Sequence, residues 1–92
     1  MDESVKTLKY ELVTFMPETL MPGVLYSSFE YAVAIHLCAC GCGIETVTPL
    51  KKGGWELSLT EDLKPTLQPS IGNQKLACKS HYWIREGKVV WA

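Results

Sequence analysis

The sequence predicts a mostly β fold, in which a small antiparallel sheet surrounds a zinc ribbon-like metal centre. First, all four cysteines and both histidines of the 92-residue chain fall within two short segments, 36–43 and 78–81. Metal sites made of thiolates and imidazoles are usually assembled from two such turns. Second, short runs of β-branched and aromatic residues are separated by glycine and proline. Third, a core of this size supplies only about 3–5 kcal/mol, so a single domain over residues 1–92 would gain stability from a metal.

In the N-terminal half, strands are expected over residues 6–15, 29–37 and 44–50. The apolar residues of the first segment also fit a helical spacing, but its β-branched residues favour a strand. The segment 16–28 is expected to be a connection, because its prolines and the Pro22-Gly23 pair favour turns. Alternation along 29–37 places His36 and Cys38 on the same face of their strand.

In the C-terminal half, the Lys-Lys-Gly-Gly run at 51–54 predicts a hairpin turn from the strand at 44–50 into a returning strand at 55–60. Residues 61–73 are expected to form a loop, because they contain two prolines and a glycine.

The final hairpin is the clearest element in the sequence. Strands 81–85 and 88–91 flank Glu86-Gly87, a two-residue turn whose glycine favours positive φ. If Arg85 pairs with Lys88, one face of the hairpin is apolar. That face consists of Tyr82, Ile84, Val89 and Trp91, and His81 projects from the other face.

Six residues are candidate metal ligands: Cys38, Cys40, Cys42, Cys78, His81 and His36. Cys78 and His81 form the firmest pair, since their spacing is that of a chelating unit. Cys40 and Cys42 complete the favoured set, and a pair of Cys38 and Cys42 is an open alternative. Zinc is the expected metal, and an iron–sulfur cluster is its main competitor.

His36 differs from the other candidates, because it shares a strand face with Cys38 but lies outside both cysteine turns. Its side chain could bind a second metal, or it could donate or accept a hydrogen bond near the first.

The cytoplasm is the expected compartment. The chain opens with Met1-Asp2-Glu3, and no apolar segment typical of a signal peptide or a membrane span follows. Cytoplasmic thiols stay reduced, and three cysteines within five residues rarely suit disulfide geometry. A metal is therefore favoured over disulfides. The net charge of −1 gives no global field that would attract nucleic acid.

Several blocks of the sequence together resemble a known family. They are P-G-V-L-Y at 22–26, H-L-C-A-C-G-C-G at 36–43, T-P-L at 48–50, Trp55, T-L-Q-P-S-I-G-N at 66–73 and C-K-S-H-Y-W-I at 78–84. The chain resembles an uncharacterised bacterial family of small metal-binding domains, some of which are encoded near ubiquitin-like conjugation genes. The resemblance implies a metal-binding β domain with an accessory role in protein modification, and it supplies no catalytic residues.

The function predicted first is a zinc-stabilised module that binds a protein partner. The residues expected to contact the partner are Ser70, Asn73, Trp83 and Arg85. Serine and asparagine would supply hydrogen bonds, and a tryptophan or arginine could anchor an interface.

Two alternatives involve different chemistry. Nucleic acid could bind through basic residues beside aromatic ones, namely Lys75, Lys79, Arg85 and Lys88 beside Tyr82 and Trp83. A zinc-dependent hydrolase is less expected, since the chain lacks the H-E-x-x-H motif and the zinc deaminase signature.

Overall fold

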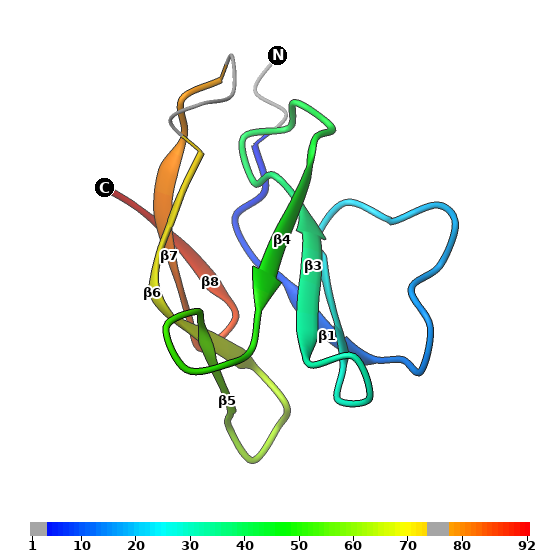
Figure 1. Cartoon of the computed structure of the whole chain (residues 1–92). Coiled ribbons are helices and arrows are strands. Elements are labelled where there is room, and N and C mark those ends of the chain that lie inside the picture. The colour runs from blue at the N-terminus through cyan, green and yellow to red at the C-terminus, as the bar shows by residue number, and fades with distance from the viewer. Residues whose placement is uncertain (1–3, 74–77) are drawn as a thin grey trace.

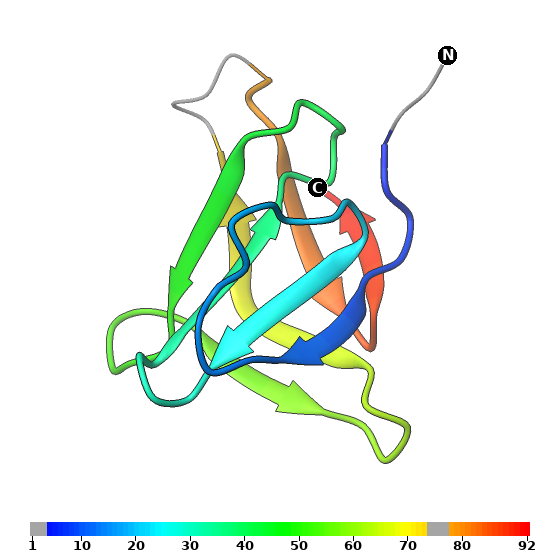
Figure 2. The same ribbon diagram turned by 90° about the vertical axis from the view of Figure 1, so that its right-hand side faces the viewer.

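Two four-stranded sheets face each other in the computed structural model, which describes residues 4–73 and 78–92 (Figures 1 and 2). Within these ranges every regular element is a strand, so the prediction of a mostly β fold is confirmed. The strands are β1 (Lys9–Leu12), β2 (Val24–Ser28), β3 (Val33–Leu37), β4 (Glu45–Pro49), β5 (Glu56–Leu59), β6 (Pro65–Gly72), β7 (His81–Arg85) and β8 (Lys88–Trp91). The described part of the chain holds no helix long and apolar enough to cross a membrane.

The first sheet has the order β1-β2-β3-β4. Strand β1 runs parallel to β2, and the other two pairings are antiparallel. The predicted connection at 16–28 is wrong over its last five residues, which form β2. This strand is buried over Leu25 to Ser28, so it shows no alternation of apolar and polar residues. Its serines are satisfied inside the fold, since Ser27 lies 2.6 Å from the Tyr10 hydroxyl and Ser28 donates to the Thr14 carbonyl at 2.9 Å.

The second sheet has the order β5-β6-β7-β8. The predicted hairpin between 44–50 and 55–60 is wrong, because β4 and β5 belong to different sheets. A turn does form at 51–54, where the Gly54 amide donates to the Lys51 carbonyl at 2.8 Å. It carries the chain from one sheet to the other, as the green segment between β4 and β5 in Figure 1 shows.

The predicted loop at 61–73 is also wrong over most of its length, because it contains β6. Pro65 opens this strand, and Pro69 lies where the register with β7 shifts between Leu67 and Ile71. Proline has no amide to donate, and these are positions where a strand tolerates it. The two prolines therefore belong to a strand with a bulge and do not indicate a loop.

The final hairpin is confirmed with its predicted register. Arg85 pairs with Lys88, and Tyr82 and Ile84 lie opposite Trp91 and Val89. Glu86 and Gly87 have φ of 48° and 79°, as a two-residue turn of this kind requires.

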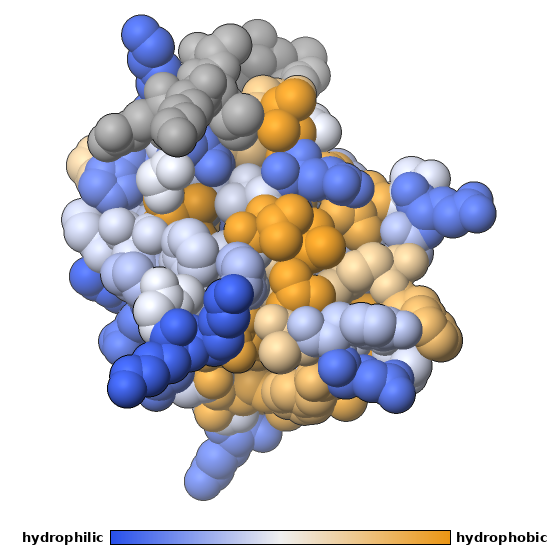
Figure 3. All heavy atoms as spheres, in the orientation of Figure 1, coloured by the Kyte–Doolittle hydropathy of each residue, from blue (hydrophilic) through white to orange (hydrophobic). Residues whose placement is uncertain are grey.

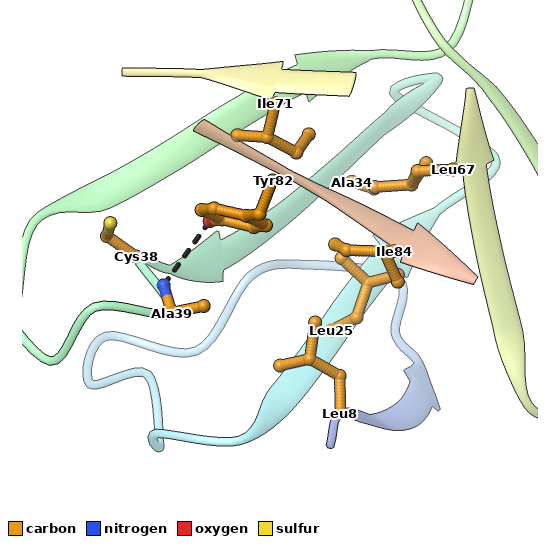
Figure 4. Packing of buried hydrophobic residues seen from close by; sticks show 9 residues of the cluster. All are labelled: Leu8, Leu25, Ala34, Cys38, Ala39, Leu67, Ile71, Tyr82 and Ile84. Atoms are coloured by element: carbon orange, nitrogen blue, oxygen red, sulfur yellow. Dashed lines mark hydrogen bonds between the residues drawn. The ribbon is translucent and has the colours of Figure 1, made fainter. Parts of the chain in front are cut away.

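The core lies between the two sheets (Figure 4). It consists of Leu8, Leu25, Ala34, Cys38, Ala39, Leu67, Ile71, Tyr82 and Ile84. The segment before β1 joins the sheets along one side, because the Leu8 amide donates to Gly87 and the Val89 amide donates to Lys6. Two core residues, Cys38 and Ala39, belong to the cysteine-rich segment, so that segment is anchored in the core.

Tyr82 is fully buried, and its hydroxyl contacts two buried groups. It lies 2.7 Å from His36 Nε2, and the Ala39 amide donates to it at 3.3 Å. Replacing Tyr82 by Phe leaves both groups without this partner, so we expect a loss of about 1–3 kcal/mol in the free energy of unfolding. Urea unfolding measures it, and Tyr31→Phe, at an exposed tyrosine, is the matched control. Equal stability of the two variants would contradict the expectation.

A four-thiol centre beside a serine–histidine pair

The four cysteines come together at one end of the fold. Cys38 follows β3, Cys40 and Cys42 lie in the next turn, and Cys78 lies in the turn before β7. All four are free thiols, and their Sγ atoms lie within 4.8 Å of one another. The Sγ of Cys38 lies 3.4 Å from that of Cys40, and the Sγ of Cys78 lies 3.8 Å from those of Cys38 and Cys42.

This arrangement fits a single metal ion. Zinc–thiolate bonds of about 2.3 Å in a tetrahedron place the sulfur atoms about 3.8 Å apart. Two of the sulfur–sulfur separations equal this value and none exceeds 4.8 Å, so the four cysteines could hold one metal ion.

The turn that carries three of the thiols depends on two glycines. Gly41 and Gly43 have φ of 92° and 80°, in the region that favours glycine. With these angles the chain folds back, so that the Gly41 amide donates to the Cys38 carbonyl at 3.1 Å. The Cys38 amide in turn donates to the Ile44 carbonyl at 2.8 Å and closes the turn.

Hydrogen bonds to the sulfur atoms favour negative charge on part of the cluster. The Ser80 hydroxyl lies 3.0 Å from Cys38 Sγ and 3.4 Å from Cys78 Sγ. Hydrogen bonds from its hydroxyl and amide lower the pKa of Cys78 to about 6. Burial and the neighbouring Cys38 thiol raise the pKa of Cys40 to about 12. The lowered pKa of Cys78 therefore favours its thiolate, and a bound cation must displace the proton of Cys40.

His36 lies outside this group. Its imidazole is fully buried, with Nε2 against the Tyr82 hydroxyl, and burial lowers its pKa to about 4. Its Nδ1 has no hydrogen-bond partner within the described residues. The observed hydrogen bond of His36 is the one to Tyr82, and both roles predicted for His36 beside the metal stay predictions.

His81 contacts a serine instead of the thiols. Its Nε2 lies 2.8 Å from the Ser70 Oγ. Strands β6 and β7 are paired with Gly72 opposite His81, so Ser70 and His81 are diagonal neighbours on one face. The bulge between Leu67 and Ile71 sets the position of Ser70 on that face. The assignment of His81 as a ligand stays a prediction, and the geometry favours the four thiols.

An aromatic ring and a cation continue the row of side chains along β7. The rings of His81 and Trp83 have centroids 5.5 Å apart, and the Arg85 guanidinium lies 5.0 Å from the centre of the Trp83 ring. Ser70 and His81 are both half-buried, so a ligand can reach them. Across residues 4–73 and 78–92, no carboxylate forms an ion pair with His81.

The residues expected to contact a partner divide into two groups. Ser70 and Trp83 contact His81, and Arg85 contacts Trp83. Asn73 belongs to the thiol centre, because its side-chain amide donates to Cys38 Sγ at 3.4 Å and contacts Ser80 Oγ at 3.2 Å.

The pairing of Ser70 with His81 is the feature that sequence reasoning missed. The spacing of His81 from Cys78 suggested chelation, and Ser70 lay in a predicted loop. A serine and a histidine on adjacent strands were the available signal, but using it required the register of β6 and β7.

Fold and site together define an all-β protein with a four-thiol centre beside a serine–histidine pair. The chain belongs to the BubE family, since the family model described as "Bacterial ubiquitination-like system serine protease (BubE)" matches residues 12–92. The expected link to a bacterial ubiquitin-like conjugation system is thus confirmed for the family. No curated protein and no solved structure matches the chain.

Proposed function

We propose that this chain is a serine peptidase of a bacterial ubiquitination-like system, with Ser70 as the nucleophile and His81 as the general base. The observation that carries the proposal is the 2.8 Å contact between His81 Nε2 and Ser70 Oγ. This is the distance at which a histidine can take the proton of a serine hydroxyl. The family description supports the same chemistry.

The reaction follows from this contact. Ser70 Oγ attacks the carbonyl carbon of the substrate while His81 Nε2 accepts the hydroxyl proton. His81 then donates that proton to the leaving group, and an acyl-enzyme remains on Ser70. A water molecule, deprotonated by His81, attacks the acyl group and releases Ser70 in its starting state.

Trp83 takes part in positioning the base. Without a carboxylate partner among the described residues, the imidazole needs another contact to fix its orientation. The Trp83 ring lies against it at an interplanar angle of 32°. Both catalytic side chains also project from paired strands, which hold a site more rigidly than loops.

The thiol centre has a structural role in this proposal, with zinc as the metal bound by Cys38, Cys40, Cys42 and Cys78. Four protein ligands leave no position for water, as in structural zinc sites. The thiols are too close together to enclose a cluster of several iron and sulfide ions. Cys78 lies three residues before His81, so the metal would fix the start of β7 and with it the base.

A zinc-stabilised interaction module without catalysis is the second candidate. It is favoured by the exposed Arg85 beside Trp83, a combination common in interfaces. The nucleic-acid alternative has less support, because Tyr82 is fully buried and cannot stack on a base. Lys75, which belonged to that prediction, lies outside the described residues.

Labelling with a fluorophosphonate probe tests the proposal, because such probes react with activated serines. We expect one adduct per chain, located on Ser70 by peptide mass spectrometry. Ser70→Ala should abolish the adduct, while Ser58→Ala, at an exposed strand serine, should leave it unchanged. No adduct on the metal-loaded, folded protein would refute catalysis and favour the interaction module.

A further inference from the structure

A groove of about 560 Å³ opens beside the serine–histidine pair. One wall is the connection between β4 and β5, and the other consists of residues from β6 and β7. The side chains that matter for its chemistry are Lys51, Lys52, Trp55, Glu56, Trp83 and Arg85. In Figure 3 hydrophilic atoms lie at the lower left, over the β4–β5 connection, and an apolar patch lies beside them in the middle of the view.

The groove leads directly to the proposed nucleophile. Pro69 lines it and immediately precedes Ser70 in the chain. Trp83 also lines it, and the Trp83 ring contacts the ring of His81. An extended peptide that occupies the groove would therefore continue past Ser70 Oγ.

The charges in the groove favour an acidic occupant. Lys51, Lys52 and Arg85 are exposed cations, and Glu56 is the one acid among the lining residues. In the part of the chain that the structure describes, none of these three cations forms an ion pair with a carboxylate. They are therefore free to bind carboxylates of a ligand, and arginine can do so with two parallel hydrogen bonds.

Arg85 is also held in place before any ligand binds. Its guanidinium lies 5.0 Å from the centre of the Trp83 ring, in the arrangement of a cation–π contact. This contact reduces the side-chain entropy lost on binding. It also covers a face of Trp83, which is then not available to stack on a nucleotide base.

We propose that this groove binds an acidic segment of the peptide substrate, next to the bond that Ser70 cleaves. The proposal deepens the proposed function and relies on it for the cleavage step. Binding itself needs only the groove, so the two can be tested separately.

The test is binding of labelled peptides to the metal-loaded Ser70→Ala protein, which cannot cleave them. Two eight-residue peptides are compared by fluorescence anisotropy, one with three glutamates and one with glutamine at the same positions. We expect the glutamate peptide to bind about tenfold more tightly at low salt, and less so as salt rises. The double variant Lys51→Gln/Lys52→Gln should reduce the preference to about twofold or less.

The matched control is Lys9→Gln/Lys64→Gln, which removes the same charge from a separate groove that shares no residue with this one. It should keep the preference. Three results would each overturn the proposal. They are equal binding of both peptides, an equal loss of the glutamate preference in the two double variants, and tighter binding of a labelled oligonucleotide than of the glutamate peptide. Fluorophosphonate labelling of the wild-type chain separates the outcomes. If Ser70 is labelled but the glutamate peptide is not preferred, only the groove proposal is refuted. If the glutamate peptide is preferred but Ser70 is not labelled, only the peptidase proposal is refuted.

Discussion

Removing the metal is expected to unfold the protein at room temperature. A structural zinc site contributes on the order of 10 kcal/mol in apparent folding free energy, which exceeds the net stability of most small domains. Cys38 and Ala39 are core residues, so releasing the thiol turn also disturbs the packing between the sheets. Circular dichroism melts with and without a chelator measure the effect, and added zinc should restore the transition.

Cys42→Ser separates loss of a ligand from loss of packing. Cys42 is exposed, so replacing it leaves no cavity in the core. We expect a large fall in both the melting temperature and the metal content, because one of four ligands is lost. Glu45→Gln, at an exposed neighbouring position, is the control and should change neither. A Cys42→Ser protein that melts like the wild type would show that the metal does not stabilise the fold.

The second large effect is expected from His81→Gln. Glutamine cannot accept the proton of Ser70, so we expect the rate of fluorophosphonate labelling to fall by about 10²–10⁴-fold. The metal content and the melting temperature should remain those of the wild type, because the metal is assigned to the thiols. Stopped-time labelling measures the rate, and elemental analysis and a thermal melt of the same preparation measure the metal content and the melting temperature.

This variant also distinguishes the two roles considered for His81. A chain that loses its metal and its stability on His81→Gln would show that the imidazole is a ligand, as its spacing from Cys78 first indicated. Trp83→Leu adds a test of positioning, since it removes the ring that lies against the imidazole but leaves the base. It should slow labelling without lowering the metal content.

Local signals predicted the parts of the fold that depend on neighbouring residues. The turn at Glu86-Gly87 fixes the register of its hairpin, and the confirmed pairing of Arg85 with Lys88 follows from it. The cysteine spacing similarly placed four thiols in two turns that the fold brings together.

The elements that were missed depend on contacts distant in sequence. Strand β2 is buried on both faces between β1 and β3, so it lacks the alternation that reveals a strand with one exposed face. Strand β6 contains two prolines, whose cost is avoided by their positions at its start and at a bulge. The division into two sheets at 51–54 likewise depends on contacts distant in sequence, because the same turn could have closed a hairpin.

The candidate site shows the same limit. The pairing of Ser70 with His81 exists only once β6 and β7 are in register, and no local spacing encodes it. By contrast, the distance of three residues between Cys78 and His81 is visible in the sequence, and it favoured a metal ligand over a base.

X-ray absorption at the edge of the bound metal tests most directly whether His81 is free to act on Ser70. We predict a first shell of four sulfur atoms at about 2.3 Å and no nitrogen. A shell of three sulfur atoms and one imidazole nitrogen at about 2.0 Å would contradict the separation of the thiol centre from the serine–histidine pair.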